Sequence, residues 1–302
     1  MGTARRSRFR SRALRAVATL AVAGGVFAGL QVASAATAAA VGTVQVIAGQ
    51  VSVSNSLSPK FAPPAVCPSG TKVLGGGGWV FVNGRTPDSE RVVLSEMRPA
   101  PSTTGGRDTF EAGAFELSPG TNANWSLQAF AVCAPPIAGL HLVVGRSISS
   151  NSLQRALVDC GSNNEAIYGV GSRILGANGQ ATLIGETSET SHQALAQARE
   201  DVDGFSGIWE LDVFAVCGPF PVNYGTSFGL SSLNPTSDPV QVAFSRCGSG
   251  KLLGMGAEIV NAIPGTGLQV VFPGSPIESS GVEATPTNAT WGPTTVQGIC
   301  GD

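Results

Sequence analysis

The feature of this chain that most constrains its fold is a pattern of cysteine, glycine and tryptophan that is written three times and uses all six cysteines. In each copy a Cys precedes a Gly-rich segment, and roughly 60 residues later a Trp-led segment ends in a second Cys. The copies run from Cys67 to Trp125 and Cys133, from Cys160 to Trp209 and Cys217, and from Cys247 to Trp291 and Cys300. Such a repeat constrains how the chain buries its core, but it does not identify what the protein binds.

The N-terminus has the features of an export signal. Six arginines fall within the first 15 residues, an apolar stretch runs from Ala16 to Leu30, and Ala33-Ser34-Ala35 has the small-x-small form of a signal-peptidase site. The apolar stretch is shorter than the roughly 20 residues of a membrane-spanning helix. We therefore expect residues 1–35 to be a signal peptide and the mature protein to be secreted and extracellular, with no membrane anchor.

Without this signal peptide the protein is more acidic, and its net charge argues against some classes of partner. The chain has 18 basic residues, and without the six N-terminal arginines 12 remain against 20 acidic ones, a net charge near −8. Binding to a nucleic-acid backbone or to an anionic membrane needs clustered basic residues, and the three lysines are scattered. We expect neither nucleic acid nor membrane as a partner.

Six cysteines in an exported chain indicate a disulfide framework. The repeat leaves two pairing schemes. Either each copy closes on itself, or the second Cys of each copy joins the first Cys of the next and Cys300 returns to Cys67. We favour self-closure. No pair of cysteines or histidines has the short spacing of a structural zinc site, so we expect neither a metal nor a cofactor.

The repeated units extend upstream of each first Cys, where we expect Gly49, Gly145 and Gly225 each to open a Ser-rich strand. After a short N-terminal segment at 36–43, we place the units at 44–138, 139–222 and 223–302, with Pro-rich junctions at 134–136 and 218–221. No long linker separates them. Junctions this short favour one domain or tightly abutted units over flexibly tethered ones.

The Trp-led segments alternate as half-buried strands do. Trp125, Leu127, Ala129, Ala131 and Cys133 fall on one face, and the second copy repeats this from Trp209 to Cys217. Glu210 and Asp212, on the other face, are expected to point to solvent. In the third copy Trp291 lies nine residues before its Cys instead of eight, which predicts a bulge or edge near Pro293 or Gly298.

The remaining patterns also predict strands, at 72–82, 91–98, 109–117, 166–175 and 252–260. Residues 191–200 have a locally helical composition, but their place in the repeat predicts a strand. The fold class we predict is all-β, with 13% charged residues, 40 Gly and 19 Pro as the supporting composition. We expect each copy to form one small antiparallel sheet, and the three disulfide-closed sheets to face inward in a β-prism-like pseudo-threefold arrangement. Three tightly packed small β-sandwich units are the alternative.

The Cys-Pro-Ser-Gly opening at 67–70, the Gly-rich strand after it and the threefold count resemble the repeats of vitelline membrane outer layer proteins. That resemblance implies a β-prism of three Greek-key sheets. The chain also resembles Cys-Pro-x-Gly repeats of secreted proteins from high-GC Gram-positive bacteria, which implies a source but no activity.

Two sequence patterns resemble nucleotide-binding or catalytic motifs, but both are incomplete. The Gly-rich strands lack the remaining residues of a phosphate loop or a dinucleotide fingerprint. Because the glycines recur at one place in three copies, we expect them to permit close backbone approach or a bulge where the sheet bends. Gly225-Thr-Ser227-Phe-Gly229 matches the nucleophile-elbow pattern, but no helix pattern follows and only His141 and His192 exist to act as a base. We expect no catalytic residues and no enzyme activity, and we keep a secreted serine hydrolase as the rival interpretation.

Repeated carboxylates are candidate ligand-binding groups. Glu116 and Glu200 both lie nine residues before their Trp, and Glu283 lies eight before its own. Carboxylates placed threefold can accept sugar hydroxyls or bind a cation, although a solvated strand face explains them as well. Asp201 and Asp203 follow Glu200 in a loop that has too few spaced oxygen ligands for a calcium site.

Trp79 breaks the repeat, because the other copies have Arg173 and Glu258 at its position. A Trp without counterparts can stack on a sugar or anchor a protein, or it can simply be buried. We therefore expect a secreted, non-catalytic binding or adaptor module for an extracellular glycan or for a protein partner in a secreted assembly. A structural protein of the cell surface is the alternative.

Overall fold

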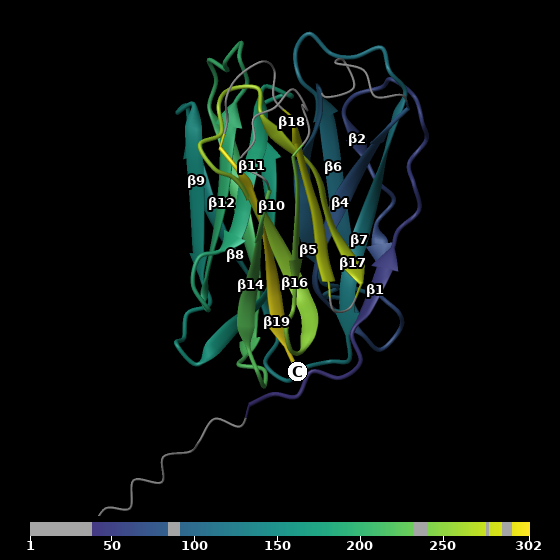
Figure 1. Cartoon of the computed structure of the whole chain (residues 1–302), viewed down its shortest axis with the longest axis vertical. Coiled ribbons are helices and arrows are strands. Elements are labelled where there is room, and N and C mark those ends of the chain that lie inside the picture. The colour runs from purple at the N-terminus through teal and green to yellow at the C-terminus, as the bar shows by residue number, and fades with distance from the viewer. Residues whose placement is uncertain (1–37, 84–90, 232–240, 276–277, 286–291) are drawn as a thin grey trace, which may run out of the picture. The chain divides into compact units, whose positions relative to one another are not determined.

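The computed structural model describes residues 38–83, 91–231, 241–275, 278–285 and 292–302, and the regular secondary structure of these residues is all β. The predicted signal peptide, 1–35, lies outside them. The strands form three antiparallel sheets (Figure 1). Nothing among the described residues forms a helix of the length and apolarity that crossing a bilayer requires.

Sheet 1 consists, in spatial order, of β1 (Gln45–Ala48), β7 (Trp125–Ala134), β4 (Lys72–Val82), β17 (Gly267–Ser275), β18 (Glu278–Thr285) and β15 (Gln241–Arg246). Sheet 2 consists of β2 (Lys60–Phe61), β6 (Thr109–Glu116), β5 (Val92–Ala100), β10 (Glu165–Leu175), β13 (Trp209–Pro219) and β8 (His141–Ser149), with β3 (Ala65–Val66) also on β6. Sheet 3 consists of β14 (Gly225–Leu230), β19 (Thr294–Gly301), β16 (Lys251–Ile259), β11 (Ala181–Ser188), β12 (Gln193–Glu200) and β9 (Leu153–Asp159).

Each sheet is assembled from two repeats, so the expectation of one sheet per copy is wrong. In sheet 1, β1, β7 and β4 of the first copy continue into β17, β18 and β15 of the third. Sheet 2 joins the first and second copies in the same way, and sheet 3 joins the second and third. Figure 1 shows β17 beside β4, although the two strands lie far apart in the sequence. The three repeats therefore exchange strands in a closed cycle.

The Gly-rich strands of the three repeats meet at one point. A Cβ atom added to Gly169 would lie 2.7 Å from the Cα of Gly75, and one added to Gly254 would lie 2.6 Å from the Cα of Gly169. A Cβ on Gly75 would in turn lie 2.9 Å from the Cα of Gly254. Real side chains do not tolerate such distances, which explains why glycine recurs at this position. The sequence-based expectation of close backbone approach is confirmed.

A register shift precedes each of these glycines, at Leu74 in β4, Tyr168 in β10 and Leu253 in β16. The extra residue of each bulge turns its side chain out of the regular alternation. All three side chains are fully buried and join Val132 and Val216 in a small apolar cluster. The bulges thus supply a second core beside the central glycine contact.

The main core contains the predicted apolar face of the Trp-led strands. Trp125, Leu127, Ala129, Ala131 and Cys133 are all inaccessible to solvent, and their counterparts from Trp209 to Cys217 belong to the same cluster. In the third copy β19 begins at Thr294 and pairs with β14 without a register shift. The bulge expected at Gly298 is therefore absent from the pairing with β14, and Trp291 lies outside the described residues.

Self-closure of the disulfides is confirmed, with bonds Cys67–Cys133, Cys160–Cys217 and Cys247–Cys300. In each pair the second Cys is in a strand of one sheet, and the first directly follows a strand of a neighbouring sheet. The first pair, for example, joins the end of β3 in sheet 2 to β7 in sheet 1. The three bonds therefore clamp sheet to sheet.

Three local expectations need correction. Asp212 is fully buried instead of solvent-facing, because Arg146 and Arg173 cover and neutralise it. The structural counterpart of Gly145 is Gly229 and not Gly225, since Gly145 pairs with Val213 and Gly229 with Val296 at the same distance from each Cys. The segment after Gly49 is mostly outside regular strand, although Ser52 and Asn55 still donate backbone hydrogen bonds to β7. The expectation for residues 191–200 is confirmed, because β12 is a strand.

Candidate functional site

The repeated glutamates anchor the repeated tryptophans. The indole Nε1–H of Trp125 donates to Glu116 at 2.7 Å, and that of Trp209 donates to Glu200 at 3.3 Å. A buried indole N–H needs an acceptor, which accounts for the fixed nine-residue spacing. Glu283 lies in β18, and its side chain is outside the described residues.

The backbone around these tryptophans is held by a second repeated contact. The Lys60 ammonium lies 3.8 Å from the centre of the Trp125 ring and donates to the carbonyl oxygens of Trp125 and Asn55. Burial lowers the pKa of Lys60, and the charge of Glu116 opposes this shift. In the second repeat the amide of Gln154 donates to the carbonyl oxygen of Trp209. A lysine in one copy and an amide in the next perform the same structural task.

The loop after Glu200 is closed on itself. The carboxylate of Asp201 accepts the backbone N–H of Gly204 at 3.1 Å, and the amide of Gln180 donates to the Gly204 carbonyl. Burial raises the pKa of Asp201, and the hydrogen bond from Gly204 partly offsets this rise. Asp203 is exposed. Within the described ranges no group of three or more His, Cys, Asp or Glu residues could hold a metal ion.

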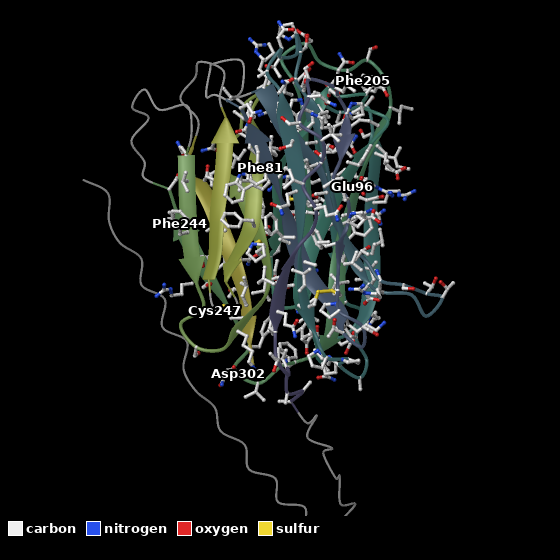
Figure 2. The ribbon with its side chains drawn as sticks, turned by 90° about the vertical axis from the view of Figure 1, so that its right-hand side faces the viewer. Phe81, Glu96, Phe205, Phe244, Cys247 and Asp302 are labelled. Carbon is white, nitrogen blue, oxygen red and sulfur yellow. A yellow bond between two sulfur atoms is a disulfide. The ribbon has the colours of Figure 1, made fainter. Side chains whose placement is uncertain are left out.

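Trp79 belongs to a group of aromatic residues on the outer face of sheet 1. Its ring stacks on Phe81 at 4.7 Å between centroids and contacts Phe272 at 4.6 Å, and Phe272 contacts Phe130 at 5.8 Å. The alternate residues Val80, Ala129 and Val271 point into the core, so these rings point outward. Phe244 of β15 lies across Ser280 from Phe272 and is 64% exposed. We call Trp79, Phe81, Phe130, Phe272 and Phe244 the aromatic face; Phe81 and Phe244 are labelled in Figure 2.

The corresponding positions of sheet 2 carry an ion network. By strand register, Trp79 corresponds to Arg173, Phe130 to Phe214, and Phe272 to Arg98. Both guanidinium groups lie within 5.9 Å of the Phe214 ring centre. Arg173 pairs with Asp212 at 2.7 Å, and Arg98 pairs with Glu96 at 2.5 Å and with Glu111. The outer face of sheet 2 is therefore covered by charged side chains that pair with one another.

The corresponding positions of sheet 3 are polar and also satisfied within the sheet. They are Glu258, Gln297 and Thr187. Glu258 accepts from Gln197 at 2.9 Å, and the Gln297 amide bonds both the N–H and the carbonyl of Ser188. The three sheets therefore have equivalent backbone pairing but different outer surfaces. The surface is apolar on sheet 1, charged on sheet 2 and polar on sheet 3.

The pattern from Gly225 to Gly229 does not have the geometry of a hydrolase nucleophile elbow. Ser227 lies within strand β14, where its hydroxyl accepts a hydrogen bond from Ser245 at 2.7 Å and lies 3.7 Å from the Cys300 sulfur. A nucleophile elbow instead places the serine on a sharp strand-to-helix turn.

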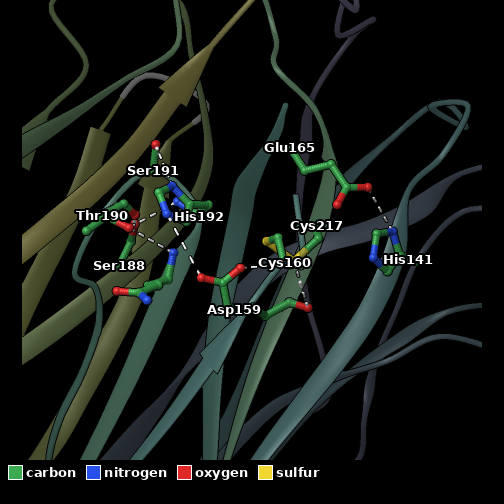
Figure 3. Close-up of a disulfide and its surroundings, with 12 residues drawn as sticks. His141, Asp159, Cys160, Glu165, Ser188, Thr190, Ser191, His192 and Cys217 are labelled. Carbon is green, nitrogen blue, oxygen red and sulfur yellow. Dashed lines mark hydrogen bonds and ion pairs between the residues drawn. A yellow bond between two sulfur atoms is a disulfide. The ribbon is translucent and has the colours of Figure 1, made fainter. Parts of the chain in front are cut away.

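Both histidines flank the Cys160–Cys217 disulfide, as Figure 3 shows. His141 lies 3.8 Å from Glu165, and His192 lies 4.0 Å from Asp159 and 3.3 Å from the Ser191 hydroxyl. The His192 carbonyl accepts the backbone N–H of Cys160, and His141 is the cross-strand neighbour of Cys217. These contacts hold the two ends of the disulfide.

A polar cavity of about 320 Å³ opens beside Glu116 at the loop that follows β6. It is lined by Arg91, Glu116, Pro119, Gly120, Thr121 and Asn122. Sequence analysis singled out Glu116 but missed the other lining residues, most of which come from the turn after β6 and show no periodicity. It also missed Phe130, Phe272 and Phe244, whose alternation with core residues was the available signal.

No protein-family model matches the chain, and a search of the curated proteins gives no match. The resemblance to vitelline membrane outer layer proteins stays a prediction from the sequence.

Proposed function

We propose that this protein is a secreted, non-catalytic binding module whose main contact surface is the aromatic face, and that its partner there is another protein of an extracellular assembly. The observation that carries the proposal is the difference between the three outer faces. Arg173 and Glu258 are satisfied by partners within their sheets, whereas Trp79 at the same position is part of an apolar surface. Large apolar surfaces rimmed by polar residues are typical of protein interaction sites.

The ring geometry favours a protein over a glycan at this surface. A sugar stacks on an open aromatic face, but the rings of Trp79 and Phe81 are stacked on each other with an interplanar angle of 15°. In this pair each ring covers one face of the other, and Phe272 contacts Trp79 as well, so ring edges are left for contacts more than ring faces. Edges pack well against aliphatic and aromatic side chains, and buried Trp and Phe anchors carry much of the affinity of protein interfaces.

The three disulfides support this role in two further ways. The three disulfides are typical of extracellular proteins and agree with the predicted signal peptide. Because they clamp neighbouring sheets, the contact surface is ordered before binding, which lowers the entropic cost of association.

The test is a pull-down, under non-reducing conditions, from medium conditioned by the source organism, using the mature protein and two variants. Phe244→Ser removes an aromatic residue of the aromatic face, and Phe61→Ser removes an equally exposed one from sheet 2, at 64% and 65% exposure. The proposal predicts one partner, identified by mass spectrometry, that is retained by the wild type and by Phe61→Ser and is lost by Phe244→Ser. Equal retention by both variants, or no partner for the wild type, contradicts it.

A further inference from the structure

We infer that the cavity beside Glu116 is a second binding site, separate from the aromatic face, and that it takes one unit of a neutral saccharide. The cavity volume of about 320 Å³ is at the lower end of the range for small-molecule sites. That size suits a single sugar ring better than an extended ligand.

The carboxylate in this cavity is fixed before any ligand arrives. One oxygen of Glu116 accepts the Trp125 indole N–H at 2.7 Å, and the other accepts the Thr121 backbone N–H at 3.0 Å. Each carboxylate oxygen can accept more than one hydrogen bond, so both remain able to accept a ligand hydroxyl. A fixed acceptor loses little entropy on binding.

Access to the carboxylate depends on a glycine. Gly120 has a φ of +88°, and a Cβ atom there would lie 3.1 Å from the nearer Glu116 oxygen. Any side chain at this position would crowd the carboxylate, and the positive φ disfavours one as well. The loop therefore keeps this side of Glu116 uncovered.

The lining carries both hydrogen-bond donors and acceptors, which match a ligand rich in hydroxyls. Arg91, whose guanidinium donates to the Ser118 carbonyl at 3.1 Å, and Glu116 place one positive and one negative group in the lining. Asn122 adds an exposed amide, which both donates and accepts. Sugar hydroxyls also both donate and accept, so they match a lining of mixed donors and acceptors. Because the site offers hydrogen bonds and little apolar contact, the affinity is expected to be on the order of millimolar.

The second repeat shows the same carboxylate in a closed setting. Glu200 binds the Trp209 indole as Glu116 binds that of Trp125, but the loop after it is tied back through Asp201, Gly204 and Gln180. Glu200 is only 8% exposed, so it binds the indole with little access for a ligand. A comparison of variants at Glu116 and at Glu200 therefore distinguishes a binding role from a purely structural one.

The experiment follows the indole N–H signals of the ¹⁵N-labelled mature protein during titration with methyl glycosides of glucose, galactose, mannose and N-acetylglucosamine. The inference predicts that at least one glycoside shifts the Trp125 signal and leaves the Trp209 signal in place. Glu116→Gln, whose amide oxygen can still accept the indole N–H, and Asn122→Ala are each expected to weaken binding, the first by at least tenfold. Glu200→Gln is the matched control and leaves the affinity unchanged.

Three results overturn the inference: no shift of Trp125 with any glycoside, equal shifts of both indoles, or equal weakening by Glu116→Gln and Glu200→Gln. Glycine is titrated as a zwitterionic probe. A Trp125 shift with glycine but with no glycoside would replace the saccharide by an amino acid and so also contradict the inference. None of these results depends on the aromatic face, so this test and the pull-down succeed or fail separately.

Discussion

The hydroxyl group of Ser172 donates a hydrogen bond of 2.5 Å to the carboxyl group of Glu186 between sheets 2 and 3, and both side chains are fully buried. At the positions equivalent to Glu186, the other repeats have Met97 and Val271. Burial raises the pKa of Glu186 to about 8, and the hydrogen bond from Ser172 opposes this rise. The carboxyl group is therefore mainly protonated in the folded protein at neutral pH.

This pair predicts that the protein loses stability as the pH rises toward 8. A carboxyl group whose pKa is higher in the folded than in the unfolded state stabilises the fold fully at pH values below its unfolded pKa, and that contribution is lost as the pH rises through the folded pKa. Between pH 5 and pH 8 we expect the free energy of unfolding to fall by about 1.4 kcal/mol per pH unit from this group. Urea unfolding curves measured across this range check the slope.

Glu186→Gln keeps the shape of the side chain and removes its titration, so it is expected to flatten the slope and to be more stable than the wild type at pH 9. Glu189→Gln, an exposed carboxylate at the end of the same hairpin, is the control and should keep the wild-type slope. A Glu186→Gln protein that retains the full slope would show that other groups cause it.

Substitution of the central glycines is expected to unfold the protein or destabilise it severely. A Cβ at Gly169 would lie 2.2 Å from the Leu74 carbonyl oxygen, and one at Gly254 would lie 2.4 Å from that of Tyr168. These neighbours are backbone and cannot move aside as a flexible side chain can. Gly169→Ala and Gly254→Ala should each cost several kcal/mol, about as much as the worst core substitutions. Thermal unfolding measures the loss, and Gly225→Ala, which meets nothing within 4 Å, should stay within about 1 kcal/mol of the wild type.

Lys60 is expected to be replaceable by its repeat counterpart but not by a small residue. Its ammonium satisfies the carbonyl oxygens of Asn55 and Trp125, as Gln154 does for Trp209 in the second repeat. Lys60→Gln should therefore cost less than about 1 kcal/mol, whereas Lys60→Ala removes two charge-assisted hydrogen bonds, leaves both carbonyl oxygens with only their backbone donors, and should cost roughly 2 kcal/mol or more. Denaturant unfolding of the two variants decides this. Equal losses would mean that the cation over the Trp125 ring, and not the hydrogen bonding, provides the stabilisation.

Removal of one disulfide is expected to cost about 4 kcal/mol, because each bond closes a loop of more than 50 residues. The Cys160→Ala, Cys217→Ala double variant is the informative case, since this bond ties sheet 3 to sheet 2. Calorimetry of this variant beside the wild type measures the shift in melting temperature. An unchanged melting temperature would show that packing at the central glycines alone fixes the sheets relative to one another.

Much of the local structure follows from the sequence because it depends on neighbours in the chain. The alternation from Trp125 to Cys133 predicted which side chains enter the core, and the recurrence of the Cys positions favoured the pairing that the structure shows. Strand exchange between repeats could not be predicted in this way. A period of two identifies the buried face of a strand, but it carries no information on whether the neighbouring strand comes from the same copy or the next.

In the candidate sites, too, the features set by nearby residues were predictable and those set by distant residues were not. Trp79 stood out because the repeat has no counterpart for it, yet its contact with Phe272 depends on a strand from the other end of the chain. Burial of Asp212 was missed because its partners Arg146 and Arg173 lie 66 and 39 residues away. The spacing of Glu116 and Trp125 was visible, but its meaning as an indole acceptor required the positions of both atoms.

The exchange of strands around the three repeats also imposes an order on folding. Sheet 2 has all of its strands once the second repeat has been made, and sheet 3 must wait for the third. In sheet 1 the strand β4 lacks its partner β17 until nearly the whole chain has been synthesised. The first repeat therefore remains a half-built sheet, with Trp79 and its unpaired edge open to other molecules, and joining the first repeat to the third is the closing step of a ring. A truncation before β17 should consequently damage the N-terminal sheet as much as the C-terminal one.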